Sequence, residues 1–489
     1  MSNVTHVEIR MYRLGTGDCF ALKFFSKNKE KPSFKMLIDA GAWSGTKDKI
    51  SPYINNLKEY LGGFVDVLVV THEHKDHVHA FDVCEELFTA DDFSVGEIWF
   101  GWTENDKIKK VKEWKESYGE KKKALGIVAN ELKKAVKSND FIKQYTGNKN
   151  ATSSLKAMGR FSNILNGFAS LHLSNVQGEY KGSLAGMEVV KTKIKKNDVK
   201  YFLPGDVLSD YSGADGIKFY VLGPPKLYDE INTETGGEGE SYKHNKILKG
   251  SDEFSAAILD INKTTSKDNI LPFDDFFVEN DITNKSKIEY DNDDWRKIDF
   301  DWLNTAGSFA LRMNSLTNNL SLALAIEFES GKVMLFPGDA EYGSWASWHN
   351  IKWDEEGKDG KHFTEDLLNR VVFYKVAHHL SHNGTAQKLG LEMMTSKELS
   401  AMATLDYDVI NDGWKSTMPN RSIINELLLR TKGRLMIMKE KGLYYDFNEE
   451  VPMSEKVKEA RNRMTAKEKK EFQASLEEDP LFIQFTVQG

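Results

Sequence analysis

Three histidines and an aspartate lie within six residues of one another in the segment His72-Glu73-His74-Lys75-Asp76-His77. The run Val65 to Val70 directly before them is largely apolar and typical of a buried strand. A loop leaving a strand can turn alternate side chains toward two neighbouring points, and Zn²⁺ readily takes this set of nitrogen and oxygen ligands. A solvated His-rich turn is the alternative, but ionisable groups crowded at a buried strand end are costly without a cation. The sequence therefore predicts a metal site whose ligands here are His72, His74, Asp76 and His77.

Two aspartates follow other runs that are typical of strands. Asp339 follows the apolar run 333–336 and a Pro-Gly turn, where its carboxylate could bridge two cations. A turn-forming aspartate after glycine is the alternative interpretation. Asp39 follows the run 36–38, and we expect its carboxylate to orient a ligand imidazole and so raise the basicity of that ligand.

A histidine pair, His378 and His379, follows the run 371–376. Neighbouring side chains at a strand end cannot both point the same way. We expect His378, the first of the two, to be a metal ligand. His379 would then support another ligand from behind or contact the substrate.

These segments, in this order, resemble the metallo-β-lactamase superfamily, whose signature is the string His-x-His-x-Asp-His. The resemblance is closest to the soluble hydrolase domain of ComEC-type DNA-uptake proteins. That domain has a Gly-x-Gly-Asp turn (here 15–18), an Asn-x-x-Ser strand (here 318–321) and a terminal His-His-Gly-Ser (here His-His-Leu-Ser, 378–381). The resemblance spans roughly residues 6–440. It implies an α/β fold, a four-layer αβ/βα sandwich, in which Asp339 bridges two metal ions.

Two departures from the family pattern bear on the metal site. Gly223 stands where many relatives supply a further histidine, and His172 and His244 are the nearest substitutes. We therefore expect the first ion to be held by His72, His74, Asp339 and water, and more weakly than in those relatives. Leu380 replaces the usual glycine of the terminal motif, and a tight turn with positive φ is costly for leucine.

The motifs are scattered along the chain, so one decorated domain over residues 1–440 is expected despite the length of 489 residues. Helical and loop insertions are expected at about 104–149, which is rich in lysine, and at about 225–305, which is polar and acidic. Residues 441–489 would add a charged helix from Ser454 to Glu478 and a terminal strand. A hairpin over 6–25, helices over 47–61 and 78–89, and a strand at 97–100 complete the expected elements.

The composition bounds the function. The net charge of −8 and the pI of about 5.9 give no overall basic field that favours nucleic acid. With only Cys19 and Cys84, no disulfide framework is implied, which fits a reducing compartment. No signal segment and no run of about 18 apolar residues is present, so a cytoplasmic protein without a membrane anchor is expected.

Two divalent ions, Zn²⁺ first and Mn²⁺ as the alternative, would lower the pKa of a shared water and supply hydroxide as nucleophile. The expected function is therefore a metal-dependent hydrolase, with Asp76 holding a metal and orienting the water. The family resemblance favours phosphodiesters, so a nuclease or phosphodiesterase is expected. His382 and Asn383 could contact a phosphate oxygen; a polar loop is the alternative.

Two other functions stay open. One is a small-molecule acyl hydrolase of the lactonase or β-lactamase type. The other is a subunit of a multi-protein bacterial system, such as a defence system, regulated by a protein partner that docks on the insertions or the C-terminal helix. The lysine-rich insertion, with Lys107, Lys109, Lys110 and Lys112, could guide a phosphate backbone, although interleaved glutamates indicate a salt-bridged solvated face.

Overall fold

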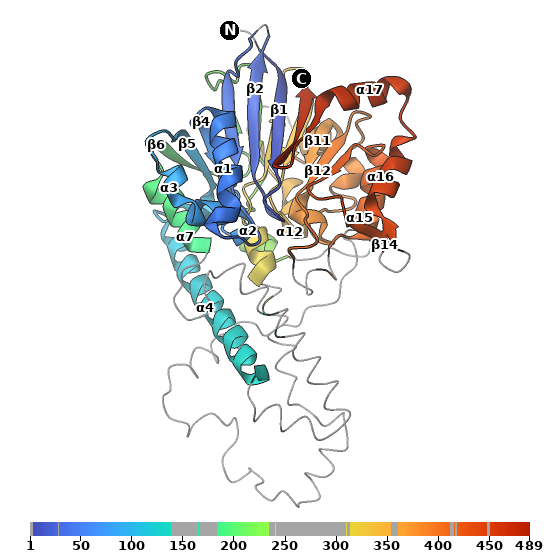
Figure 1. Ribbon diagram of the computed structural model, residues 1–489. Coiled ribbons are helices and arrows are strands. Elements are labelled where there is room, and N and C mark those ends of the chain that lie inside the picture. Colours follow the sequence, from blue (N-terminus) through green and yellow to red (C-terminus); the bar gives the residue numbers. More distant parts are fainter. Residues whose placement is uncertain are drawn as a thin grey trace, which may run out of the picture.

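Two large mixed β-sheets form the centre of the computed structural model (Figure 1). The structure describes residues 3–27, 29–137, 162, 165, 183–233, 240, 310, 313–353, 360–410, 415, 418–446 and 450–489. His172, His244, residues 138–149 and most of the expected insertion at 225–305 lie outside the described residues.

The first sheet has eight strands in the order β16-β17-β1-β2-β3-β4-β5-β6. β1 and β2 form the expected antiparallel hairpin, β2 pairs antiparallel with β3, and β3 to β6 are parallel. The strands are β1 Val4–Tyr12, β2 Phe20–Ser26, β3 Phe34–Ile38, β4 Phe64–Val69, β5 Ser94–Gly101, β6 Lys196–Phe202, β16 Leu476–Glu478 and β17 Phe482–Gln488.

The second sheet has seven strands in the order β13-β12-β11-β10-β9-β8-β7. β10 to β13 are parallel, whereas β7, β8, β9 and β10 pair antiparallel. The strands are β7 Val207–Leu208, β8 Lys218–Val221, β9 Leu324–Glu327, β10 Val333–Phe336, β11 Val371–Lys375, β12 Ser400–Ala403 and β13 Leu435–Ile437. β14 Tyr444–Asp446 and β15 Val451–Pro452 form a separate pair.

The two sheets share one core, and helices cover their outer faces. Along β2, Phe20 and Phe24 enter the core common to both sheets, whereas Ala21 packs toward the helices on the outer face. β10 alternates in the same way, because side chains of a strand point to opposite faces in turn. The outer helices are α1 Lys47–Leu61 and α2 Lys75–Val83 on the first sheet, and α12 Tyr342–Trp348, α13 Gly360–Asn369 and α15 Arg421–Arg430 on the second. The fold is an α/β sandwich, as expected.

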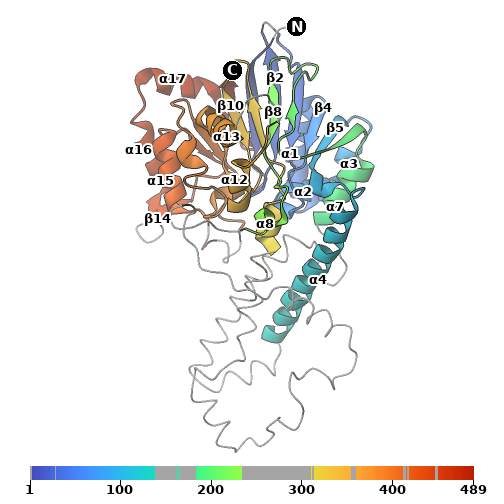
Figure 2. The same cartoon turned by 180° about the vertical axis from the view of Figure 1, so that it is seen from behind.

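Part of the lysine-rich insertion is the long helix α4 Lys109–Lys137, which runs away from the sheets (Figures 1 and 2). The remaining helical elements are short. They are α3 Glu85–Phe88, η1 Trp102–Glu104, α7 Ser183–Glu188, η2 Val189–Lys193, α8 Tyr228–Ile231, η6 Ala377–Leu380 and η7 Leu391–Met393, followed by α16 Met453–Arg461 and α17 Ala466–Ser475.

The C-terminal segment differs from the expectation of one helix over 454–478, which was wrong. Two helices, α16 and α17, are separated by a turn at 462–465. The second begins because Thr465 and Glu468 form a capping box, in which each side chain accepts a hydrogen bond from the other residue's backbone N–H. The expected terminal strand is confirmed: β17 pairs with β1 and completes the first sheet.

Within the described residues, we find no helix that combines the length and the apolar character needed to cross a membrane.

The topology brings distant parts of the sequence to one edge of the sandwich. Parallel strands end at the same edge of a sheet, so the residues that follow β3 and β4 are neighbours, as are those that follow β10, β11 and β12. The turn after β1 lies at this edge too, because β1 and β3 are both antiparallel to β2. Every segment singled out for its histidines and aspartates follows one of these strands.

Candidate metal centre

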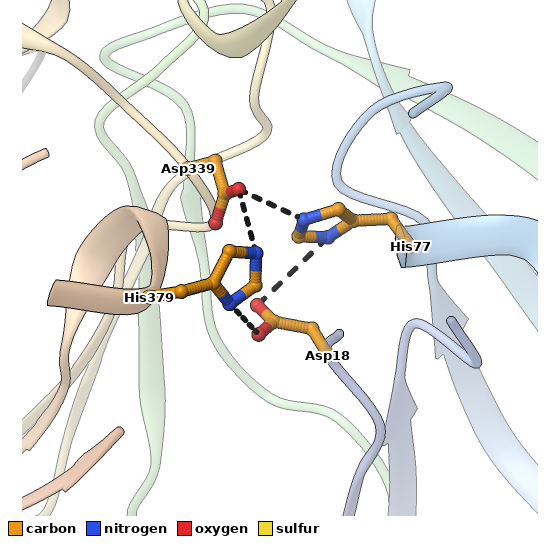
Figure 3. Close-up of side chains that lie close together, drawn as sticks. All are labelled: Asp18, His77, Asp339 and His379. Atoms are coloured by element: carbon orange, nitrogen blue, oxygen red, sulfur yellow. Dashed lines mark ion pairs between the residues drawn. The ribbon is translucent and has the colours of Figure 1, made fainter. Parts of the chain in front are cut away.

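Four buried side chains, Asp18, His77, Asp339 and His379, form a group that could hold a metal ion (Figure 3). They come from the turn after β1, the first turn of α2, the end of β10 and the turn after β11. Each is at most 1% exposed. Two of them, Asp18 and His379, were not expected as ligands from the sequence.

The Nε2 atoms of two imidazoles converge on the same carboxylate oxygen. His77 Nε2 lies 3.1 Å from Asp339 Oδ2, and His379 Nε2 lies 3.2 Å from that oxygen. Asp76 Oδ2 is 3.1 Å from His379 Nε2. Two ring nitrogens and two carboxylates therefore surround one point, which is a suitable ligand set for a divalent transition metal.

The opposite, Nδ1, sides of both rings are held by hydrogen bonds. His77 Nδ1 lies 2.7 Å from Asp39 Oδ2, and Asp39 also accepts hydrogen bonds from the backbone N–H and hydroxyl of Thr71. His379 Nδ1 lies 2.7 Å from the hydroxyl of Thr404, which donates to Asp18 Oδ1. Both rings donate these hydrogen bonds when their proton is on Nδ1. The Nε2 atom of each ring is then left to bind a metal. Asp39 thus occupies the supporting position expected for it.

Asp18 is better explained as a support than as a ligand. Its carboxylate lies on the Nδ1 side, 3.8 Å from His77 Nδ1 and 3.9 Å from His379 Nδ1. The two nitrogens of an imidazole point in diverging directions, so an ion bound through both Nε2 atoms lies on the side of Asp339. Figure 3 shows the two carboxylates on opposite sides of the rings. Asp18 is linked to His379 through the hydroxyl of Thr404, on the side of the ring away from Asp339.

The raised pKa values of the two histidines show that the buried carboxylates stabilise positive charge at this site. Burial alone would lower the pKa of His379, but the carboxylates of Asp339 and Asp76 raise it to about 9. The pKa of His77 is likewise raised well above its usual value, because Asp339, Asp39 and Asp18 outweigh the effect of burial. In the absence of an ion, two imidazolium groups neutralise the carboxylates. A divalent ion would replace their Nε2 protons.

Lys375 at the end of β11 is a further cation within the group, and the sequence reasoning missed it. Its buried ammonium pairs with Asp18, donates to Gly338 O at 2.8 Å and lies 3.1 Å from Asp339 Oδ1. Burial would lower its pKa, but the carboxylates of Asp18 and Asp339 raise it above the usual value. Since Lys375 holds Oδ1 of Asp339, the Oδ2 atom is directed at the histidines. A lone lysine in an otherwise apolar strand was the available signal.

A second pair of imidazoles lies beside the first. His72 Nε2 and His74 Nδ1 face each other at 3.0 Å, and the His72 and His77 rings are 4.0 Å apart. Burial lowers the pKa of His74 to about 4 and that of His72 well below its usual value, so both rings are neutral. His72 Nδ1 lies 3.3 Å from the hydroxyl of Ser321. Two neutral nitrogens directed at one point could hold a second ion.

His378, the expected ligand, lies outside this group. Its Nδ1 is 3.1 Å from Asn383 Oδ1 and 3.4 Å from Glu341 Oε1, and its Nε2 is 3.4 Å from the amide of Asn318. The backbone N–H of His378, in contrast, donates to Asp339 Oδ1 at 3.2 Å. The expected preference is therefore reversed: His379 points into the metal group, and His378 belongs to the buried polar network of Glu341.

The cause is the backbone of the turn after β11. His378, His379 and Leu380 have φ values of 46°, 49° and 68°, so three consecutive residues with side chains adopt the left-handed conformation. Each such residue costs on the order of 1 kcal/mol, which persists only where the surroundings fix it. Leu380 adopts a positive φ, which glycine would take at a lower cost, and its side chain is fully buried. Strain of this kind is concentrated at functional sites.

The remaining expected residues are placed as follows. At Gly223, an added Cβ would lie 2.9 Å from the carbonyl oxygen of Ser321, so the backbone there packs too closely for a histidine. Asn383 accepts a hydrogen bond from Ser381 at 3.0 Å, besides its contact with His378. His382 is half-buried, and its role toward a substrate stays a prediction.

No protein-family model and no curated protein matches the sequence.

The role of Lys375 leads to a prediction about stability. Replacing it in the variant Lys375→Met would leave two buried carboxylates without their ammonium, which costs about 3–5 kcal/mol for a broken buried pair. Urea unfolding of the metal-free protein measures this loss. The matched control is Lys200→Met, because Lys200 pairs with Glu97 at 2.6 Å near the surface and its loss should cost at most about 1 kcal/mol. Equal losses in the two variants would contradict the role given to Lys375.

Proposed function

We propose that the chain is a metal-dependent hydrolase with the four-layer metallo-β-lactamase fold, and that it holds two divalent ions, Zn²⁺ or Mn²⁺. The proposal rests on histidine ring nitrogens that converge in two neighbouring sets at one edge of the sandwich. One set consists of Nε2 of His77 and His379 with Asp76 and Asp339. The other consists of Nε2 of His72 and Nδ1 of His74.

The residues present fit such ions. Asp339 Oδ2 lies within 3.2 Å of both Nε2 atoms, and it could be shared between the two sets because the ring of His72 lies 4.0 Å from that of His77. The supporting carboxylates also fit, since metal-binding histidines usually donate their other N–H to a carboxylate, hydroxyl or carbonyl. Asp39 and Thr404 supply these acceptors.

When bound, the ions would lower the pKa of a water molecule toward neutrality and polarise the bond to be cleaved. The protein residues keep the ligands in position and remove water from around them. Asp76, at the first turn of α2, would hold an ion and orient the attacking water. Burial tends to raise its pKa, but the hydrogen bond and charge of His379 lower it to about 2, so the carboxylate is ionised at neutral pH.

Phosphodiesters are the proposed substrates, because the ordered motifs resemble those of the ComEC-type hydrolase domain. An enzyme that hydrolyses phosphodiesters would act as a nuclease or phosphodiesterase. The test is hydrolysis of linear DNA, RNA and a chromogenic phosphodiester, with a chromogenic β-lactam and a lactone alongside. Cleavage of the β-lactam or lactone alone would favour the acyl hydrolase instead.

We expect Asp76→Asn to abolish this activity. The substitution keeps the shape of the side chain but removes a charged ligand, and even groups that only support metal ligands are worth 10–100-fold in activity or affinity. Metal-dependent turnover should therefore fall by more than about 100-fold. Asp82→Asn, on the same helix and outside the metal group, is the matched control and should keep full turnover. Wild-type turnover in Asp76→Asn would exclude the role given to this residue.

The exposed lysines at the start of α4 separate a nuclease from a small-molecule hydrolase. Lys109 lies 3.6 Å from Glu113, which offsets part of its charge, and Lys110 lies over the ring of Tyr228. If Lys107, Lys109, Lys110 and Lys112 guide a polynucleotide, changing all four to glutamine should weaken binding of long DNA. The slope of log affinity against log salt should fall by up to about 0.9 per lost phosphate contact.

Hydrolysis of the chromogenic ester should be unchanged, because the metal group is not altered. A control with Lys456, Lys458, Lys467 and Lys470 changed to glutamine removes the same charge from α16 and α17. Equal effects of the two sets on DNA binding would mean that the α4 lysines form only a solvated face.

A further inference from the structure

Lys122 of α4 is buried, whereas the lysines at and just before the start of the helix are exposed. Lys107, Lys109, Lys110 and Lys112 are all exposed, whereas Lys122 is 1% exposed. An ammonium group removed from water requires a partner, because burial of an unpaired charge is strongly unfavourable. Burial lowers the pKa of Lys122 to about 7.

The partner of Lys122 is the residue between two proposed metal ligands. Lys122 Nζ forms an ion pair with the carboxylate of Glu73, which is itself 9% exposed. The ammonium also lies 4.5 Å from the ring centroid of Tyr118, one helical turn earlier. Glu73 stands between His72 and His74 in the loop that follows β4. The inserted helix thus contacts the His-x-His loop directly.

Tyr118 links the same helix to a second segment of the site. Its hydroxyl donates to Met313 O at 2.7 Å and contacts the hydroxyl of Thr317. This segment leads to Ser321, whose hydroxyl lies 3.3 Å from His72 Nδ1 and accepts from the backbone N–H of Asp339 at 3.1 Å. One face of α4 therefore contacts both segments that surround His72.

The start of α4 is fixed to the body of the protein independently of these contacts. Lys115 lies 2.8 Å from the buried carboxylate of Glu104, and Lys191 lies 2.7 Å from it. The ring of Trp114 also contacts that of Tyr228 in α8, with ring centroids 6.4 Å apart. These contacts give the helix a defined position from which Lys122 reaches the loop.

We propose that Tyr118 and Lys122 form a clamp by which the inserted helix sets the metal-binding geometry of His72 and His74. The inference rests on the proposed function, since it concerns the affinity of that same site for metal. In an extended loop, alternate side chains point to opposite sides, so holding Glu73 on one side directs its two histidine neighbours to the other. Lys122 and Tyr118 are positioning residues, and displacement of α4 would weaken metal binding.

The test compares zinc binding by Lys122→Met, Glu73→Gln and the double variant. Competition with a chromogenic chelator gives the zinc dissociation constant. Each single variant should bind zinc about 10–100-fold more weakly, as is typical when a group that supports a ligand is lost. The double variant should be no weaker than either single variant, because both remove the same interaction. Glu73→Gln conserves volume and therefore covers the case in which Lys122→Met does not fold.

Lys58→Met is the matched control, because it removes the ion pair of a largely buried lysine of α1 that involves neither α4 nor the His-x-His loop. It should bind zinc as the wild type does. Wild-type zinc affinity in Lys122→Met and Glu73→Gln, or equal weakening in Lys58→Met, would overturn the proposal.

Hydrogen exchange of the backbone amides at 71–77 in the metal-free protein provides a second measurement. Exchange should be faster in Lys122→Met and Glu73→Gln than in the wild type and Lys58→Met, because the loop loses its support. If the wild type bound no zinc, the proposed function would fail, and this measurement would still decide the clamp. Equal exchange in all four proteins would contradict it.

Discussion

The crowding of buried carboxylates at one sheet edge is the constraint on which the rest of the site depends. Asp18, Asp39, Asp76 and Asp339 are all nearly inaccessible to water, and they come from four separate segments of the chain. Such a group is stable only when positive charge balances it. Lys375 supplies one cation, and His77 and His379 supply two more by binding protons, which leaves one negative charge in excess.

This balance explains why the site is suited to metal ions. The proton on each Nε2 is exchangeable, whereas the Nδ1 side of each ring is occupied by Asp39 or Thr404. The backbone after β11 adds rigidity, since three left-handed residues direct His379 inward and His378 toward Glu341. The positions and the charges of His77 and His379 are thus fixed by different parts of the chain. The α4 clamp supports the neighbouring histidines, His72 and His74.

Much of the site could be predicted from the sequence, because its residues directly follow apolar runs. The strands β3, β4, β10 and β11 and their terminal polar residues were expected, and parallel pairing brings them together. Asp39 also lies in the supporting position expected for it. These inferences need only the alternation of apolar residues and the place where each run stops.

Other features depend on contacts that no local pattern encodes. The choice between His378 and His379 follows from three positive φ values, which residues other than glycine rarely adopt. Asp18 joins the site because the hairpin turn between β1 and β2 lies at the same edge as the ends of β3 and β4. The break between α16 and α17, in contrast, has a local sequence signal, because Thr465 and Glu468 have the spacing of a capping box.

The claim that this edge is a two-metal centre is tested most directly by anomalous X-ray diffraction from crystals of the zinc-loaded protein. The account predicts two ions. One should be bound by Nε2 of His77 and His379 with Asp76 and Asp339, and the other by Nε2 of His72 and Nδ1 of His74. Bound zinc on the Asp18 side of the rings, zinc held by His378 in place of His379, or no zinc at this edge would contradict the account.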